Sequence, residues 1–120
     1  MNDKIKVGIG NEGETAREFV EAWRRVERNE APERPVEQLY FPDLDMLLRV
    51  LTPRRMALLK RLHVIGPLSV RALSKALERD YKNVHTDIRM LERVGLVMRH
   101  KDGRLWVPWK RIIVEFRLVA

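Results

Sequence analysis

Residues 81–93 combine basic and hydrogen-bonding side chains at helical spacing. At about 100° per residue, Val84, Ile88 and Leu91 form one apolar stripe. The opposite face and its flanks hold no acidic residue and consist of Lys82, Asn83, His85, Thr86, Arg89 and Arg93. Lys and Arg bind phosphates, whereas Arg and Asn can each bind a base edge through paired hydrogen bonds. This face therefore predicts contacts with the phosphates and bases of a DNA duplex.

The elements before this helix would hold it in place. Ser69 is expected to cap a helix over 70–77, and Glu78-Arg79-Asp80 forms a short polar connection. Gly95 lies just past the end of the 81–93 helix, where a left-handed residue is favoured. Two short helices joined in this way are typical of a helix-turn-helix. Phosphate contacts are expected from these two helices and from the helix that starts at Pro53, through Ser69, Arg71, Lys75, Arg54 and Arg55.

A β-hairpin is predicted directly after the 81–93 helix. Residues 96–99 can form one strand and 105–107 the other, with the Asp102-Gly103 turn signal between them. A hairpin in this position is the wing of a winged helix. Its basic side chains, which suit phosphates or the minor groove, are Arg99, Lys101 and Arg104.

Several stretches resemble small archaeal and bacterial DNA-binding proteins with a MarR/ArsR-type winged helix. The similarity is carried by Leu51-Thr52-Pro53-Arg54-Arg55, Gly66-Pro67-Leu68-Ser69-Val70-Arg71, Asp80-Tyr81-Lys82-Asn83-Val84-His85 and Leu91-Glu92-Arg93-Val94-Gly95-Leu96-Val97. The resemblance implies transcriptional regulation, and some such proteins act as antitoxins. Thr86 is a departure, because the resemblance leads us to expect a basic residue there.

Charge is distributed unevenly along the 120 residues. Residues 1–52 hold 8 basic and 11 acidic side chains, whereas residues 53–120 hold 16 basic and 6 acidic ones. The second half is therefore suited to a polyanion, and the first half to another task. The absence of cysteine excludes disulfides and thiol chemistry, and no apolar run is long enough for a membrane span. We expect a cytoplasmic protein.

The N-terminal part predicts a strand over 4–10, a helix from Thr15 to about Asn29 and a short strand over 36–41. Residues 8–13 have the G-x-G-x-x-G spacing of dinucleotide-binding loops. We reject a nucleotide site, because the βαβ unit around these residues is missing and no parallel second strand with a ribose-binding acid is evident. Asp43 is expected to cap a short helix whose apolar face consists of Leu44, Leu47, Leu48 and Leu51. Thr52-Pro53 is expected to begin a second helix, whose inner side is marked by Met56, Leu59, Leu62 and His63 or Val64.

The tail alternates over 111–119, with Ile112, Val114, Phe116 and Leu118 on one side. A strand alone is not stable, so we expect it to pair with residues 5–9, within the chain or across a dimer. The 15–28 helix would cover this sheet. In a homodimer, two recognition helices would enter successive major grooves about ten base pairs apart, so the operator would be an inverted repeat.

Nothing in the sequence indicates catalysis or a metal site. The spacing of His63, His85 and His100 does not match a helical metal site, and no nucleophile lies in a recognisable motif. Trp106 and Trp109 are expected to pack where the hairpin meets the body. We therefore predict no enzyme, no catalytic residue and no cofactor.

The predicted fold class is α+β, mainly helical. It comprises a strand-helix extension over 1–50, a winged helix-turn-helix over 51–109 and a C-terminal strand over 110–120. The predicted function is a DNA-binding transcriptional regulator, a repressor, whose partners are double-stranded DNA and a second copy of the chain. The alternative is an antitoxin that neutralises a toxin through its acidic N-terminal half and regulates its own operon.

Overall fold

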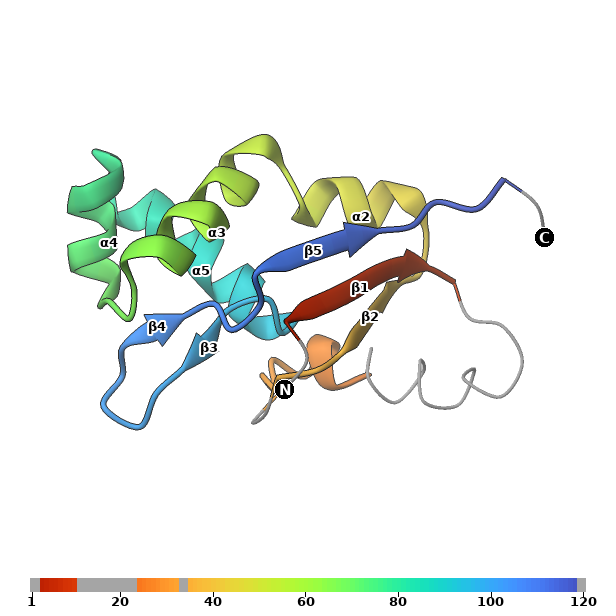
Figure 1. Ribbon diagram of the computed structural model, residues 1–120, viewed down its shortest axis with the longest axis horizontal. Coiled ribbons are helices and arrows are strands. Elements are labelled where there is room, and N and C mark those ends of the chain that lie inside the picture. The colour runs from red at the N-terminus through yellow and green to blue at the C-terminus, as the bar shows by residue number, and fades with distance from the viewer. Residues whose placement is uncertain (1–2, 11–23, 33–34, 119–120) are drawn as a thin grey trace.

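The computed structural model describes residues 3–10, 24–32 and 35–118, and it is a mixed α/β structure (Figure 1). A small sheet contains the strands β1 (Lys4–Ile9), β2 (Gln38–Phe41) and β5 (Arg111–Val114). The helices α2 (Leu44–Val50), α3 (Pro53–Ile65), α4 (Val70–Leu77) and α5 (Tyr81–Arg93) follow β2 in the chain. A hairpin of β3 (Met98–Arg99) and β4 (Leu105–Trp106) leads from α5 to β5.

The sheet has the strand order β2-β1-β5, and both outer strands run parallel to β1. The predicted pairing of the C-terminal strand with residues 5–9 is thus confirmed within one chain: Ile5 lies opposite Ile112, and Val7 opposite Val114. The expectation that the chain lacks a parallel second strand is wrong, because Gly8 of β1 pairs with Tyr40 of β2. A strand of four residues has too little pattern to reveal its partner in the sequence.

The glycine pattern lies only partly within the described residues. Gly8 allows close approach, because a Cβ there would lie 3.1 Å from the Tyr40 ring, and Gly10 has a φ of 77°. Residues 11–13, which complete the spacing, lie outside the described residues, as do Thr15 and most of the predicted 15–28 helix. The described part of that helix ends as expected, with helical residues 24–27 and a turn at Asn29.

Local capping signals set the helix starts, as predicted for Asp43, Thr52 and Ser69, whereas Asp80 was predicted only as part of a polar connection. Side-chain oxygens of Asp43, Thr52, Ser69 and Asp80 accept backbone hydrogen bonds from the first turns of α2, α3, α4 and α5, respectively. Gly95 follows α5 with a φ of 91°, which glycine adopts without strain. These start signals are local, so they can be read directly from the sequence.

Some predicted faces and bounds differ from the structure. In α3 the buried residues are Leu58, Leu59 and Leu62, while Met56 and Val64 are exposed. In α2 Leu48 is exposed and Val50 is buried. The inward face of each helix is set by the neighbours against which it packs, which the helical wheel alone does not show. The predicted strands 36–41, 96–99, 105–107 and 111–119 are shorter, at Gln38–Phe41, Met98–Arg99, Leu105–Trp106 and Arg111–Val114.

One contiguous core joins the sheet to the helices. Ile5, Phe41, Leu58, Ile88 and Leu105 all belong to it and have no exposed surface. The segment before α4 also contacts the hairpin, because Leu68 and Leu105 exchange two backbone hydrogen bonds of 3.0 and 2.7 Å. The hairpin is thereby attached to the helical body on one side and followed immediately by β5.

Candidate functional site

The helix α5 is held by an apolar stripe and a capped start. Val84, Ile88 and Leu91 are fully buried, as the sequence predicts. The Asp80 carboxylate accepts a hydrogen bond of 3.4 Å from the backbone N–H of Asn83. This anchoring fixes which side of α5 faces outward.

The outward side of α5 is open at its N-terminal half. Lys82, Asn83, Thr86 and Arg89 are exposed, whereas His85 is half-buried. The Thr86 hydroxyl donates to the backbone carbonyl of Lys82 at 3.0 Å, which leaves its lone pairs on the surface. Within the described part of the chain, the side chains of Lys82, Asn83 and Arg89 have no hydrogen bond or ion pair. They are therefore available to an external acceptor.

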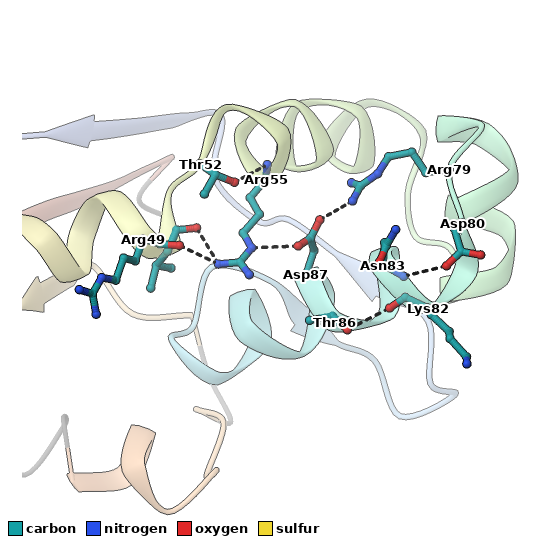
Figure 2. A network of polar contacts seen from close by, with 10 residues as sticks. Arg49, Thr52, Arg55, Arg79, Asp80, Lys82, Asn83, Thr86 and Asp87 are labelled. Carbon is teal, nitrogen blue, oxygen red and sulfur yellow. Dashed lines mark hydrogen bonds and ion pairs between the residues drawn. The ribbon is translucent and has the colours of Figure 1, made fainter.

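The opposite edge of α5 carries a charged network in which one carboxylate pairs with two arginines of the same chain (Figure 2). The buried Asp87 carboxylate binds Arg55 Nε at 3.0 Å and Arg79 Nη2 at 2.7 Å. Arg55 also donates to the backbone carbonyls of Arg49 and Val50, at 3.0 and 3.2 Å. Arg55 was expected to contact a phosphate, but these bonds commit it to joining α2, α3 and α5.

The N-terminal ends of α4 and α5 meet around Tyr81. The Arg71 guanidinium lies 5.3 Å from the centroid of the Tyr81 ring, a cation–π geometry. The His85 ring stacks on the same tyrosine with centroids 5.9 Å apart. Arg71 and Tyr81 are exposed, so this cluster presents a cation beside the open half of α5. The predicted residues Ser69, Lys75 and Arg54 are also exposed, with the Ser69 hydroxyl oxygen already accepting from Ala72 N–H at 3.1 Å.

The hairpin's basic residues differ in how they are bound. Arg99 makes two hydrogen bonds to the Glu92 carboxylate, at 2.8 and 2.9 Å, and a third to the Gly103 carbonyl. The Glu92 carboxylate raises the pKa of Arg99 above its ordinary value. Arg104 pairs with Asp102 at 2.8 Å, and Lys101 is exposed with no ion pair within the described ranges. Of these three predicted residues, Lys101 is thus the one left uncommitted.

The C-terminal half of α5 has a neighbour. Arg89, Glu92 and Arg93 line a cavity of about 180 Å³ together with Asn29 and Ala31. Pro32 lies so close to Gly95 that a Cβ on this glycine would be 2.9 Å from the proline Cγ. Arg93 is half-buried here. The segment after the N-terminal helix therefore borders this end of α5, and the N-terminal half is the more accessible one.

Three residues of this region were not among the predicted site residues: Tyr81, Arg79 and Asp87. Asp87 lies beside the apolar stripe of its helix, and an acid at that position signals a buried carboxylate that needs cationic partners. Nothing in the sequence shows that these partners are Arg55 and Arg79, which lie 32 and 8 residues away in the chain.

Two tryptophans and the two histidines outside α5 pack against, or lie close to, other parts of the chain. Trp109 is buried in the core, while Trp106 stacks on His100 with ring centroids 5.0 Å apart. A ring nitrogen of His63 lies 2.9 Å from the Val107 carbonyl. Among the described residues there is no cluster of three or more His, Cys, Asp or Glu that could hold a metal. None of the helices described here has the length and apolar character needed to cross a membrane.

Residues 50–114 match the profile of the HVO_A0114 family. The match covers more than half of the chain and includes α3, α4, α5, the hairpin and β5, so the protein belongs to this family. No curated protein and no solved structure matches the chain.

Proposed function

We propose that this protein is a DNA-binding transcriptional regulator, a repressor, with a winged helix-turn-helix of the MarR/ArsR type. The observation that carries the proposal is the open N-terminal half of α5. Its Lys82, Asn83 and Thr86 side chains are exposed, hydrogen-bonding and unopposed by any acid on the same face. In helix-turn-helix proteins the N-terminal residues of the second helix contact base edges.

The surroundings of α5 support this assignment. The α4 and α5 helices are joined by Glu78, Arg79 and Asp80 alone, and Glu78 makes the turn with a φ of 52°. The β3–β4 hairpin follows α5 and bonds back to Leu68, an arrangement that suits a wing. Arg71 lies beside the open half of α5, 5.3 Å from the Tyr81 ring, and Lys75 and Lys101 are exposed on α4 and on the hairpin, where they could bind phosphates of a duplex.

The proposed division of roles follows from these contacts. Asn83 and Thr86 face the base edges in the major groove, and Lys82 and Arg89 bind phosphate or guanine. Arg71, Lys75, Ser69 and Arg54 bind the DNA backbone, and Lys101 binds a phosphate beside the hairpin, whereas Arg104 is already paired with Asp102. Arg55 does not contact DNA itself. Its hydrogen bond to Asp87 holds α5 in position.

The test is fluorescence anisotropy with a duplex from the upstream region of the protein's own gene and a scrambled duplex of equal length, at two salt concentrations. Specific binding predicts about a hundredfold or greater preference for the first duplex, and affinity that falls steeply with salt. Equal, weak binding to both would contradict the proposal and favour the antitoxin alternative.

A further inference from the structure

The strand β5 lies at an edge of the sheet and presents apolar side chains to solvent. Among the described residues, the order β2-β1-β5 leaves one side of β5 without a neighbouring strand. Ile113 is 39% exposed and Val114 48%, and Phe116, two residues past the strand, is 57% exposed. Edge strands of monomeric proteins usually carry charges, prolines or bulges that prevent further pairing. The strand Arg111–Val114 has one charged residue, Arg111 at its start, and neither a proline nor a bulge.

The backbone of β5 is prepared for another strand. The N–H groups of Arg111 and Glu115 donate to the carbonyls of Asp3 and Val7, at 3.2 and 2.8 Å. Alternate residues of a parallel strand bond to the same neighbour, so the N–H and C=O groups of Ile112 and Val114 point to the open edge. In an antiparallel pair, such outward groups can be exchanged two at a time.

We propose that a second copy of this chain pairs with β5, antiparallel, around a two-fold axis at Ile113. This register places Ile112 opposite Val114 of the second copy, and their outward N–H and C=O groups form a hydrogen-bonded pair. It also places Arg111 opposite Glu115 of the second copy, and the symmetry makes this pair twice. Within one chain, Arg111 lies 3.6 Å from Asp3 and Glu115 lies 3.1 Å from Lys6, and because all these side chains are about half exposed, Arg111 and Glu115 can turn toward the second copy. The three-stranded sheets join into one of six strands.

Charge complementarity selects this register among its neighbours. An axis at Ile112 would place Arg111 opposite Ile113 of the second copy, with no ion pair. An axis at Val114 would place Arg111 opposite Arg117, two like charges. Only the axis at Ile113 opposes a cation to an anion on both sides of the dyad, which favours an antiparallel pair.

An apolar groove on the inner face of β5 would be covered by the same contact. The groove has a volume of about 390 Å³ and is lined on one side by α3 and on the other by Ile112 and Val114. Exposed apolar residues of α3, Met56 and Val64, line it. Because the dyad runs through Ile113, the grooves of the two copies would adjoin, and each would receive apolar side chains of the other β5.

The pairing does not depend on DNA binding, and it is tested without DNA. Sedimentation equilibrium of the full chain over a range of concentrations measures the mass and the dimer dissociation constant. A dimer is expected. A monomer at concentrations up to about 1 mM would overturn the proposal.

Two charge reversals test the register. Arg111→Glu alone opposes two pairs of carboxylates, and Glu115→Arg alone opposes two pairs of cations, so each should weaken the dimer about tenfold or more. An equimolar mixture of the two variants opposes cation to anion at both places and should dimerise as the original does. A mixture no stronger than either variant alone would exclude this register.

Two further variants separate the interface from the fold. Lys6→Ala removes the Lys6–Glu115 ion pair of 3.1 Å within one chain and should leave the dimer unchanged. Val114→Pro removes an outward N–H but no bond to β1, so it should give a folded monomer by circular dichroism. A folded Val114→Pro variant that still dimerises with the original affinity would overturn the proposal.

Discussion

Basic side chains on the two sides of α5 are in different states. On the inner edge, Asp87 binds Arg55 and Arg79 at 3.0 and 2.7 Å in a half-buried setting. On the outer face, Lys82 and Arg89 are exposed and have no ion pair within the described part of the chain. The comparison teaches that a count of basic residues does not identify a polyanion site. What matters is which cations are already paired with anions of the chain itself.

The basic residues of the hairpin also differ in whether they are already paired within the chain. Arg99 donates two hydrogen bonds to the Glu92 carboxylate, while Lys101, two residues later, has no ion pair within the described part of the chain. We expect committed cations to contribute mainly to stability, and uncommitted cations mainly to affinity for the ligand. Each of the following predictions compares one kind of residue with the other.

The largest effect is expected on stability, from Asp87→Ala. The change leaves Arg55 and Arg79 as unpaired, partly buried cations, and breaking such a network costs about 3 kcal/mol. Urea unfolding followed by circular dichroism measures the loss. The matched control is Asp102→Ala, which breaks a fully exposed pair and should hardly alter the midpoint. Equal midpoints for the two variants would contradict an internal role for Asp87.

The next effect is on sequence preference, from Asn83→Ala. A side chain that reads a base edge contributes about 1–3 kcal/mol of discrimination. The variant should therefore bind the upstream duplex more weakly, by about tenfold or more, with less change on the scrambled duplex. Competition anisotropy measures both affinities. An equal loss on the two duplexes would show that Asn83 contacts only the backbone.

A smaller loss of stability is expected from Arg99→Ala. The Arg99–Glu92 pair is bidentate but partly exposed, so its removal should cost less than about 1 kcal/mol. Lys101→Ala should leave stability unchanged and lower affinity for both duplexes. Thermal unfolding measures the stability of both variants, and anisotropy measures their affinity for both duplexes. The reverse pattern would mean that the hairpin contacts are misassigned.

The smallest effect is expected on stability at acid pH, through Asp102 in the hairpin turn. The backbone N–H of Arg104, followed by its guanidinium, holds the pKa of Asp102 below its ordinary value. A carboxylate whose pKa is lowered by folding stabilises the protein at pH values above its pKa in the unfolded chain. This stabilisation is lost as the pH falls through its pKa in the folded protein. An NMR titration of the Asp102 carboxyl should show the lowered midpoint, which Arg104→Ala should raise. An unchanged midpoint in that variant would contradict this cause.

The sequence predicts the local parts of this fold better than the distant ones. The starts of α3, α4 and α5 follow from Thr52-Pro53, Ser69 and Asp80, whose capping acts within a few residues. The sequence does not reveal that β1 pairs in parallel with β2. The paired residues lie about 32 positions apart, and no local pattern indicates which distant strand a strand will join.

The candidate site shows the same limit. The outer face of α5 follows from helical periodicity, so Lys82, Asn83 and Thr86 could be named in advance. The commitment of Arg55 could not, because it depends on contacts with Asp87 and with carbonyls at the end of α2. Such contacts are set by tertiary packing, which periodicity does not report.

The most direct test of the central claim is the salt dependence of DNA binding by Lys82→Ala and by Lys4→Ala, measured by anisotropy on the upstream duplex. Lys4 is an exposed lysine of β1, outside α4, α5 and the hairpin. We predict that Lys82→Ala weakens binding and lowers the slope of log affinity against log salt by about one for each copy bound, whereas Lys4→Ala changes neither. Equal affinities and slopes for both variants would contradict the claim that the open half of α5 binds DNA.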